Sequence, residues 1–228
     1  MKRILSAIAA AAIVFACAPK NGPVTDVQTM TSPDGNMEMT FQLTEAGTPQ
    51  YALNYGDTKV ILPSDLGFVL RGNLKAEQLV YNSDGTISKV DYDPEIPFYE
   101  GFSVEGVETD SFDETWEPVW GEEAKIRNNY NELVVNLIHK STDRRMNIRF
   151  RLYDDGLGFR YEFPYTFETR YFVINEEMTQ FALAGDHVAW WIPGDYDTQE
   201  YDYTESRLSE IASLMPKAIT GNMSQTPF

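Results

Sequence analysis

Residues 190–203, which read WWIPGDYDTQEYDY, combine carboxylates with aromatic rings at short spacing. The segment contains the carboxylates Asp195, Asp197, Glu200 and Asp202, and Glu205 follows two positions after its end. The aromatic rings are those of Trp190, Trp191, Tyr196, Tyr201 and Tyr203. Carboxylate oxygens bind hard cations such as calcium and accept hydrogen bonds from hydroxyls, whereas flat rings stack on the apolar faces of sugars. The segment therefore points to chemistry on sugars.

The spacing of these carboxylates does not define a known calcium loop. Asp195-x-Asp197 begins like an EF-hand, but the glycine of the EF-hand turn is missing and Glu200 comes too early. From spacing alone, cation or sugar binding and a solvated acidic loop both remain open. A second acidic and aromatic segment, residues 111–120 (SFDETWEPVW), is on its own more typical of a packed loop with satisfied carboxylates than of a site.

The elements that must position these residues have the periodicity of strands from Val27 to about Ile192. The clearest case is residues 146–163, where apolar and polar side chains alternate on both sides of the turn residues Asp154-Asp155-Gly156. The alternating apolar residues are Met146, Ile148, Phe150 and Leu152 before the turn, then Phe159, Tyr161 and Phe163 after it. This pattern predicts an antiparallel hairpin.

Similar runs predict further strands, with turn signals between them. The predicted strands are Met37–Leu43, Gln50–Tyr55, Ile87–Tyr92, Glu132–His139 and Tyr171–Ile174, and the predicted turns are residues 33–36, 83–85 and 128–129. A short helix is predicted at Glu205–Met215, capped by Thr204 and ended by Pro216. Strands that recur without helices between them predict an all-β sandwich.

Composition excludes several classes of function. The chain has 35 acidic and 18 basic residues and a net charge of −17, so it would repel nucleic acid and anionic lipid. Its 228 residues contain no GxSxG, HExxH, CxxC or P-loop motif. The two histidines, His139 and His187, are 48 positions apart, and we expect both to be structural, with His139 at the surface.

The N-terminus has the features of an export signal. Lys2 and Arg3 precede an apolar stretch, residues 4–16, that is too short to span a bilayer comfortably. It ends at Cys17, the only cysteine, in a sequence resembling a bacterial lipobox, so we expect a signal peptide over residues 1–16, lipid attachment at Cys17 and a tether over residues 17–26. An ordinary secretory leader is the alternative. Both interpretations place the protein outside the cytoplasm, in the periplasm or on the outer membrane.

Five long stretches together resemble glycoside hydrolase family 97. They are SPDGNMEMTFQL, SFDETWEPVWGEEAKIRNNYNEL, NIRFRLYDDGLGFRYEFP, FALAGDHVAWWIPGDYDTQEYDYTESRLSEI and SQTPF, and they extend from about Asp26 to Phe228. The resemblance is greatest to the calcium-dependent, inverting α-glucosidases of starch-utilisation systems in Bacteroidota. It implies that residues 27–228 form the family's N-terminal β-super-sandwich, of the galactose-mutarotase-like kind, with its last strands missing.

The same resemblance implies how function is divided within such an enzyme. In the family, a (β/α)₈ barrel follows the N-terminal domain and carries the general acid and base glutamates, so we expect no catalytic residue in this chain. A glutamate of the N-terminal domain joins barrel glutamates in binding calcium, and Glu200 matches that position. Asn222 is a weaker candidate for contact with the sugar, because Gly221 and Met223 beside it depart from the family pattern.

The resulting expectation is an N-terminal domain of an extracytoplasmic α-glycosidase that binds carbohydrate, contributes to a calcium site and is inactive alone. Its partners would be an oligosaccharide, either a starch-type α-glucan or an α-galactoside, and its own catalytic barrel, with membrane contact only through a lipid anchor. The alternative function is a free-standing, non-catalytic carbohydrate-binding lipoprotein.

Overall fold

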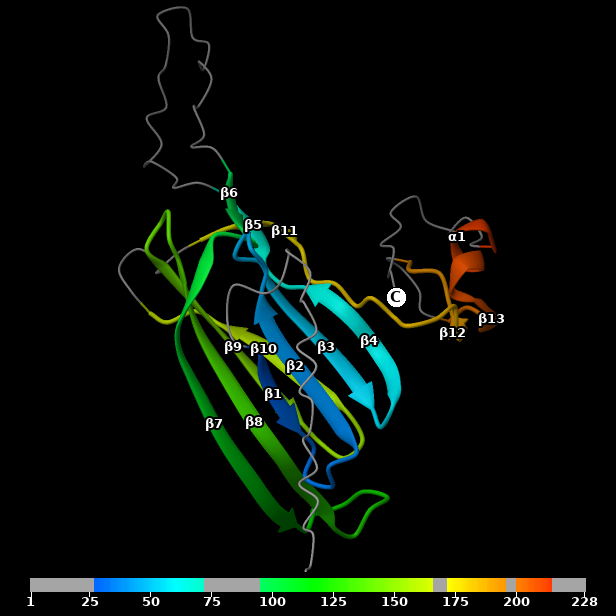
Figure 1. The fold of residues 1–228 in the computed structure, drawn as a ribbon. Helices are drawn as coiled ribbons and strands as arrows, with labels where there is room; N and C mark the ends of the chain where they lie inside the picture. The colour runs from blue at the N-terminus through cyan, green and yellow to red at the C-terminus, as the bar shows by residue number, and fades with distance from the viewer. Residues whose placement is uncertain (1–26, 72–94, 166–171, 196–199, 215–228) are drawn as a thin grey trace, which may run out of the picture.

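The computed structural model describes residues 27–71, 95–165, 172–195 and 200–214. Within these ranges the chain forms four antiparallel sheets (Figure 1). The first has the order β1-β2-β3-β4, from β1 (Gln28–Thr31), β2 (Met37–Leu43), β3 (Pro49–Tyr55) and β4 (Thr58–Asp65). The second has the order β10-β9-β8-β7, from β7 (Phe102–Trp116), β8 (Ile126–His139), β9 (Arg144–Leu152) and β10 (Leu157–Glu162).

These two sheets enclose one hydrophobic core, which confirms the predicted all-β sandwich. In β9 the residues Met146, Ile148, Phe150 and Leu152 are fully buried, because alternate side chains of a strand lie on the same face. Phe150 contacts Phe41 across the core, with ring centroids 5.9 Å apart. Burial of such a side chain stabilises the fold by roughly 1.5–3 kcal/mol.

The predicted hairpin of residues 146–163 is confirmed as β9 and β10. Leu152 pairs with Leu157 across the turn, and Phe150 pairs with Phe159. The same register sends Arg149, Arg151 and Arg160 to the outer face of the sheet.

A small third sheet has the order β11-β5-β6 and consists of β5 (Phe68–Leu70), β6 (Ile96–Phe98) and β11 (Ile174–Glu177). It extends the core through Phe68 and Phe98, which are both buried. Gly67 precedes β5 with φ +140°, and a Cβ there would lie 2.5 Å from the Cα of Tyr99. Only glycine allows this approach of two backbones.

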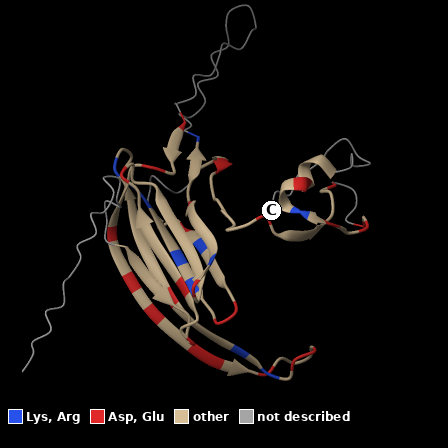
Figure 2. Ribbon diagram, turned by 45° about the vertical axis from the view of Figure 1, so that its right-hand side comes forward, with Lys and Arg blue, Asp and Glu red and all other residues tan. Residues whose placement is uncertain are grey.

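The fourth sheet is the two-stranded ribbon of β12 (Val188–Trp191) and β13 (Thr204–Arg207). It is followed by the 3₁₀ turn η1 (Leu208–Glu210) and the short helix α1 (Ile211–Leu214). In Figures 1 and 2 this lobe stands apart from the two large sheets. The chain enters it after the Ile61–Leu183 bridge, where Ala184 N donates to Val60 O at 3.2 Å.

The ribbon corrects the predicted helix at Glu205–Met215. Residues 204–207 are a strand, because their backbone pairs with β12, from Trp191 opposite Thr204 to Val188 opposite Arg207. Only residues 208–214 are helical, and Thr204 is therefore not a helix cap. Met215 and Pro216 lie outside the described residues.

Other predicted elements differ in part. The strands at Met37–Leu43, Gln50–Tyr55 and Glu132–His139 are confirmed within β2, β3 and β8, and the turn at residues 33–36 is confirmed between β1 and β2. The turn predicted at residues 128–129 is wrong, because Asn128 and Asn129 lie inside β8, opposite Glu114 and Asp113. Of the predicted strand Tyr171–Ile174, Tyr171 lies outside the described residues, and only Ile174 of the other three belongs to a strand. The elements predicted at 83–85 and 87–92 also lie outside the described residues.

The expectation that His139 is a surface residue is also wrong. Its side chain is 2% exposed, between Phe98 and Phe102 with both centroid distances 5.2 Å, and its Nδ1 lies 2.8 Å from the Oγ1 of Thr142. Burial lowers the pKa of His139 below its ordinary value, and nearby Arg144 lowers it further. Among the described residues, no helix is both long and apolar enough to cross a membrane.

Candidate functional site

The β12–β13 ribbon separates the aromatic side chains of residues 190–203 onto two faces. Trp191 is 3% exposed, and its indole Nε1 donates to the Oγ of Ser206 at 3.0 Å. Trp190 is 65% exposed, and its Nε1 donates to Oε2 of Glu205 at 3.0 Å. Tyr203, which directly precedes β13, is also exposed. One face of the ribbon therefore anchors the lobe, while the other presents rings and a carboxylate to solvent.

The carboxylates of the segment also differ in surroundings. Asp195 is 2% exposed and accepts a hydrogen bond of 2.5 Å from the Tyr201 hydroxyl. Glu200 and Asp202, on either side of Tyr201, are exposed. The segment thus has an internal carboxylate, which accepts a hydrogen bond from a nearby tyrosine, and exposed carboxylates on either side of that tyrosine.

The start of the helical turn is fixed by Asp186. The backbone N and the Oγ of Ser209 donate to its two carboxylate oxygens at 2.9 and 2.8 Å, and these bonds lower the pKa of Asp186. Arg207 donates to the backbone oxygen of Asp186 at 2.8 Å. These contacts join the two ends of the lobe, and they leave His187 exposed in the connecting turn.

The structure places only part of the predicted site. Glu200 is exposed beside Tyr201, whereas Asp197, Asn222 and Cys17 lie outside the described residues, as do the predicted leader and tether. Within the part of the chain that the structure describes, no three side chains of His, Cys, Asp or Glu gather as a metal centre. One exposed carboxylate is far from the six to eight oxygens that calcium takes.

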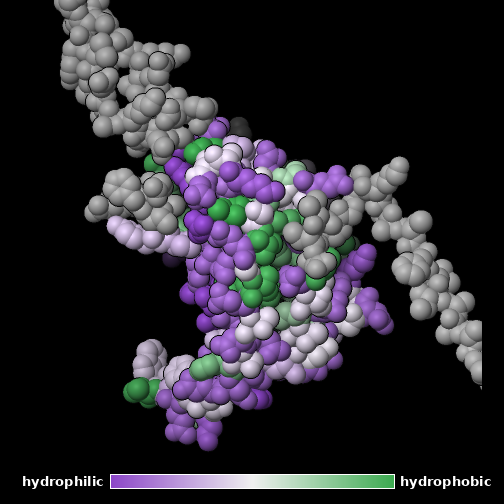
Figure 3. All heavy atoms as spheres, turned by 60° about the vertical axis from the view of Figure 1, so that its left-hand side comes forward, coloured by the Kyte–Doolittle hydropathy of each residue, from purple (hydrophilic) through white to green (hydrophobic). Residues whose placement is uncertain are grey.

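The second acidic and aromatic segment, residues 111–120, is not the packed loop that its composition suggests. Residues 111–116 continue β7, and the turn that follows carries two of the most exposed hydrophobic side chains, Val119 at 100% and Trp120 at 89%. Carboxylates follow β7 along its length (Figure 2). Figure 3 turns the left-hand side of Figure 1, where β7 lies, toward the reader, and shows a hydrophobic area surrounded by hydrophilic side chains.

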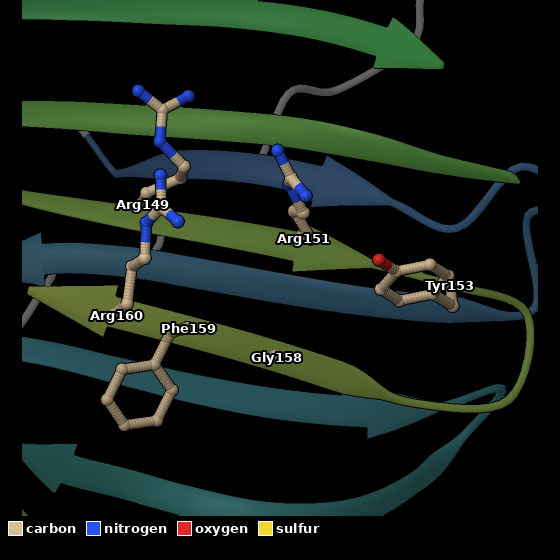
Figure 4. A pocket seen from close by; sticks show the side chains of 6 residues that line it. All are labelled: Arg149, Arg151, Tyr153, Gly158, Phe159 and Arg160. Atoms are coloured by element: carbon tan, nitrogen blue, oxygen red, sulfur yellow. The ribbon is translucent and has the colours of Figure 1, made fainter. Parts of the chain in front are cut away.

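A charged network on the outer face of β8, β9 and β10 was not identified from the sequence. Arg149 donates to both Glu132 and Glu162, Arg151 donates to Glu132 at 2.7 Å, and Arg160 donates to Glu162 at 2.8 Å. A pocket of about 180 Å³ opens beside this network, lined by Arg149, Arg151, Tyr153, Gly158, Phe159 and Arg160 (Figure 4). The sequence indicated this network only through the polar side chains that alternate with apolar ones in residues 147–160.

Comparison with known families and structures agrees with this fold. The family model described as "Glycosyl-hydrolase 97 N-terminal" matches residues 30–228. The chain therefore belongs to glycoside hydrolase family 97, as its N-terminal domain.

Two solved structures show the same relationship. They are of a glycoside hydrolase family 97 enzyme from Pseudoalteromonas sp. strain K8, one in complex with panose and one with acarbose. Each is 29% identical to this chain with a TM-score of 0.62, and the match covers 78% of this chain and 24% of that enzyme. A β-arabinopyranosidase, 16% identical with a TM-score of 0.58 over 78% of this chain and 26% of its own, has the same fold. The chain thus spans about a quarter of the length of these enzymes.

Proposed function

We propose that this chain serves as the N-terminal domain of an extracytoplasmic α-glycosidase and contributes Glu200 to a calcium site shared with a catalytic barrel. The family membership supports the glycosidase, and the panose and acarbose complexes of the Pseudoalteromonas enzyme support an oligosaccharide substrate. The general acid and base would come from the barrel, because glycoside hydrolysis requires a pair of carboxyl groups on the two sides of the scissile bond.

The arrangement around Glu200 is the observation that carries this proposal. Glu200 is exposed, while its neighbour Tyr201 is held by a hydrogen bond to the buried Asp195. A carboxylate next to a side chain that is held in this way should lose less conformational entropy when it binds an ion than one in an unanchored loop. When bound, calcium would supply a positive charge that orients catalytic carboxylates and polarises a sugar oxygen or water.

The exposed face of the β12–β13 ribbon suits a sugar beside such an ion. The indole face of Trp190 offers an apolar surface for a pyranose ring, and Glu205 is held next to it by the indole N–H. Glu205 retains a second oxygen that can accept from a sugar hydroxyl. We place Asn222 in the same role, as a weaker candidate for contact with substrate.

The proposal extends to location and substrate. The charged start and apolar stretch of residues 2–16, followed by Cys17, support export and a lipid anchor, in the periplasm or on the outer membrane. The substrate would be a starch-type α-glucan or an α-galactoside. The barrel, rather than this chain, would decide between the two sugars.

The test uses the polypeptide that joins this domain to its catalytic barrel. Hydrolysis of nitrophenyl α-glucoside and α-galactoside is measured over a series of free calcium concentrations. Glu200→Gln should raise the calcium concentration for half-maximal activity by about tenfold or more, because a neutral amide replaces a charged ligand.

Asp202→Asn is the matched control, since Asp202 is an exposed carboxylate two positions away. It should leave the calcium dependence unchanged. Equal calcium dependence in Glu200→Gln and the unsubstituted enzyme would refute the metal role, and absence of hydrolysis of both glycosides would refute the α-glycosidase.

A further inference from the structure

The pocket on the outer face of the second sheet exists because a glycine lies where the strand pattern would place a side chain. Gly158 of β10 pairs with Arg151 of β9, so the space above the sheet at this position is empty. In Figure 4 the side chains of Arg149, Arg151 and Arg160 project to the same side of the sheet, while that of Phe159 points to the opposite side, toward the core. The polar wall of the pocket is therefore formed by guanidinium groups.

These guanidinium groups are held in place before any ligand arrives. Glu132, whose side chain is 9% exposed, receives hydrogen bonds from Arg149 and Arg151, and Glu162 receives them from Arg149 and Arg160. Arg151 also lies over the ring of Tyr130, with its Cζ 4.4 Å from the ring centroid. A site whose side chains are fixed in this way loses little entropy on binding.

The charges around the pocket are largely compensated, which indicates the class of ligand. Three guanidinium groups, those of Arg149, Arg151 and Arg160, face the two carboxylates of Glu132 and Glu162. At physiological salt, charges farther than about 8 Å are largely screened, so these ion pairs matter more here than the net charge of the chain. An anion would compete with carboxylates that already hold the guanidinium groups, whereas hydroxyls can donate to the carboxylates and accept from the guanidinium groups.

Aromatic side chains line the same face. Tyr153 lines the pocket, its ring centroid lies 5.3 Å from that of Tyr130, and Tyr130 stacks on Phe112 of β7 at 5.4 Å. Flat rings beside donors and acceptors of both kinds are typical of sugar sites. The volume of about 180 Å³ is suited to one sugar unit and not to a chain of them.

We propose that this pocket is a second sugar-binding site, which holds one neutral pyranose unit of a glycan. It lies on the second sheet, whereas Glu200 belongs to the β12–β13 lobe, so it goes beyond the calcium-linked role proposed above. Its effect would be to hold a glycan on the enzyme at a point separate from hydrolysis.

The test measures binding by this chain alone, so that its outcome is independent of activity and of calcium. Panose, raffinose and cellotriose are titrated in turn and followed by the Nε–H resonances of the arginines in NMR spectra, with glucuronate and sulfate as anionic probes. At least one neutral sugar should shift the resonances of Arg151 and Arg160, with a Kd on the order of 1 mM, as a single sugar unit permits.

Gly158→Val fills the pocket from the strand that forms its floor. No heavy atom lies within 4 Å of a Cβ at this position, and valine suits a strand, so the fold should be retained. The Kd should rise at least about tenfold, equivalent to 1.4 kcal/mol. Gly156→Ala, in the turn of the same hairpin and equally free of neighbours, is the control and should bind as the unsubstituted chain does.

Three results would overturn the proposal. The first is that none of the neutral sugars binds at tens of millimolar, which would make the network a purely structural set of ion pairs. The second is that glucuronate or sulfate binds more tightly than every neutral sugar. The third is that a sugar binds equally well to Gly158→Val, which would place its site elsewhere.

Discussion

The hydroxyl of Tyr201 donates a hydrogen bond of 2.5 Å to the carboxylate of Asp195, which is 2% exposed. These two residues lie on either side of Glu200 in the sequence, and Tyr201 follows it directly. The bond therefore joins the residue next to the proposed metal ligand to a buried carboxylate. In metal sites, groups that orient a ligand in this indirect way contribute substantially to affinity.

Tyr201→Phe removes this hydrogen bond and keeps the ring. In the polypeptide with its catalytic barrel, we expect the calcium concentration for half-maximal activity to rise by about tenfold, with kcat at saturating calcium preserved. Tyr203→Phe, which alters an exposed hydroxyl two positions away, should leave both quantities unchanged. A loss of kcat at saturating calcium would mean that Tyr201 acts on something other than the ion.

Glu132→Gln tests the network on the outer face of the second sheet. This buried carboxylate pairs with Arg149 and Arg151, and its loss leaves two guanidinium groups with fewer partners. We expect the free energy of unfolding in urea to fall by about 2 kcal/mol. Glu105→Gln breaks the more exposed pair with Arg145 and should cost less than about 1 kcal/mol, so an equal effect of the two variants would contradict this account.

Two glycines allow the cost of backbone strain to be measured separately from the cost of a steric clash. Gly35 and Gly47 have nearly the same positive φ, +76° and +78°, but only at Gly47 would an added Cβ meet another backbone, 2.7 Å from the N and O of Phe102. Gly35→Ala should lower the free energy of unfolding by about 1 kcal/mol, from the left-handed conformation alone. Gly47→Ala should lower it by about 3 kcal/mol or more, and similar values for both would show that the backbone near Phe102 adjusts freely.

The buried His139 gives stability a dependence on pH. Its pKa is lowered in the folded state, so the unfolded chain, which protonates near 6.5, binds more protons at mildly acidic pH. The stability that the chain gains by burying His139 in its neutral form is complete above pH 6.5. It is lost as the pH falls from there toward the pKa of His139 in the folded state. The free energy of unfolding is measured in urea at pH 7.5 and at pH 5.5. It should fall less between these two pH values in His139→Phe than in the unsubstituted chain.

The exposed His187 provides the control for this measurement. His187→Phe should retain the full loss of stability on acidification. If His187→Phe removed that loss and His139→Phe did not, the buried histidine would not be its origin.

Much of the sandwich could be predicted from the sequence because its strands have one buried and one exposed face. The alternation in residues 146–163 fixed both the hairpin and the face that enters the core, since a shift of one residue would expose Phe150. Where both faces of a strand are solvated, the alternation disappears. This is why Asn128 and Asn129, in the exposed half of β8, resembled a turn, and why Thr204 to Arg207, in a two-stranded ribbon, resembled a helix.

The candidate sites were less predictable, for two different physical reasons. Glu200 was identified through family resemblance, because one exposed carboxylate among several has no distinctive spacing. The pocket at Gly158 depends on the register of three strands, which brings Glu132 next to Arg151 and leaves a glycine opposite it. Such a cross-strand arrangement has no pattern along a single segment of sequence.

The acidic side chains of β7 also oppose one way in which two copies of this protein could pair. Among the described strands, β7 is the last in its sheet, and the alternate positions 108, 110, 112 and 114 carry three carboxylates, Glu108, Asp110 and Glu114, together with Phe112. A second copy that added its own β7 edge to edge would bring these carboxylates close to their counterparts, and like charges across a strand pair oppose each other. The edge therefore discourages self-association at low salt, and this protection weakens as ionic strength rises.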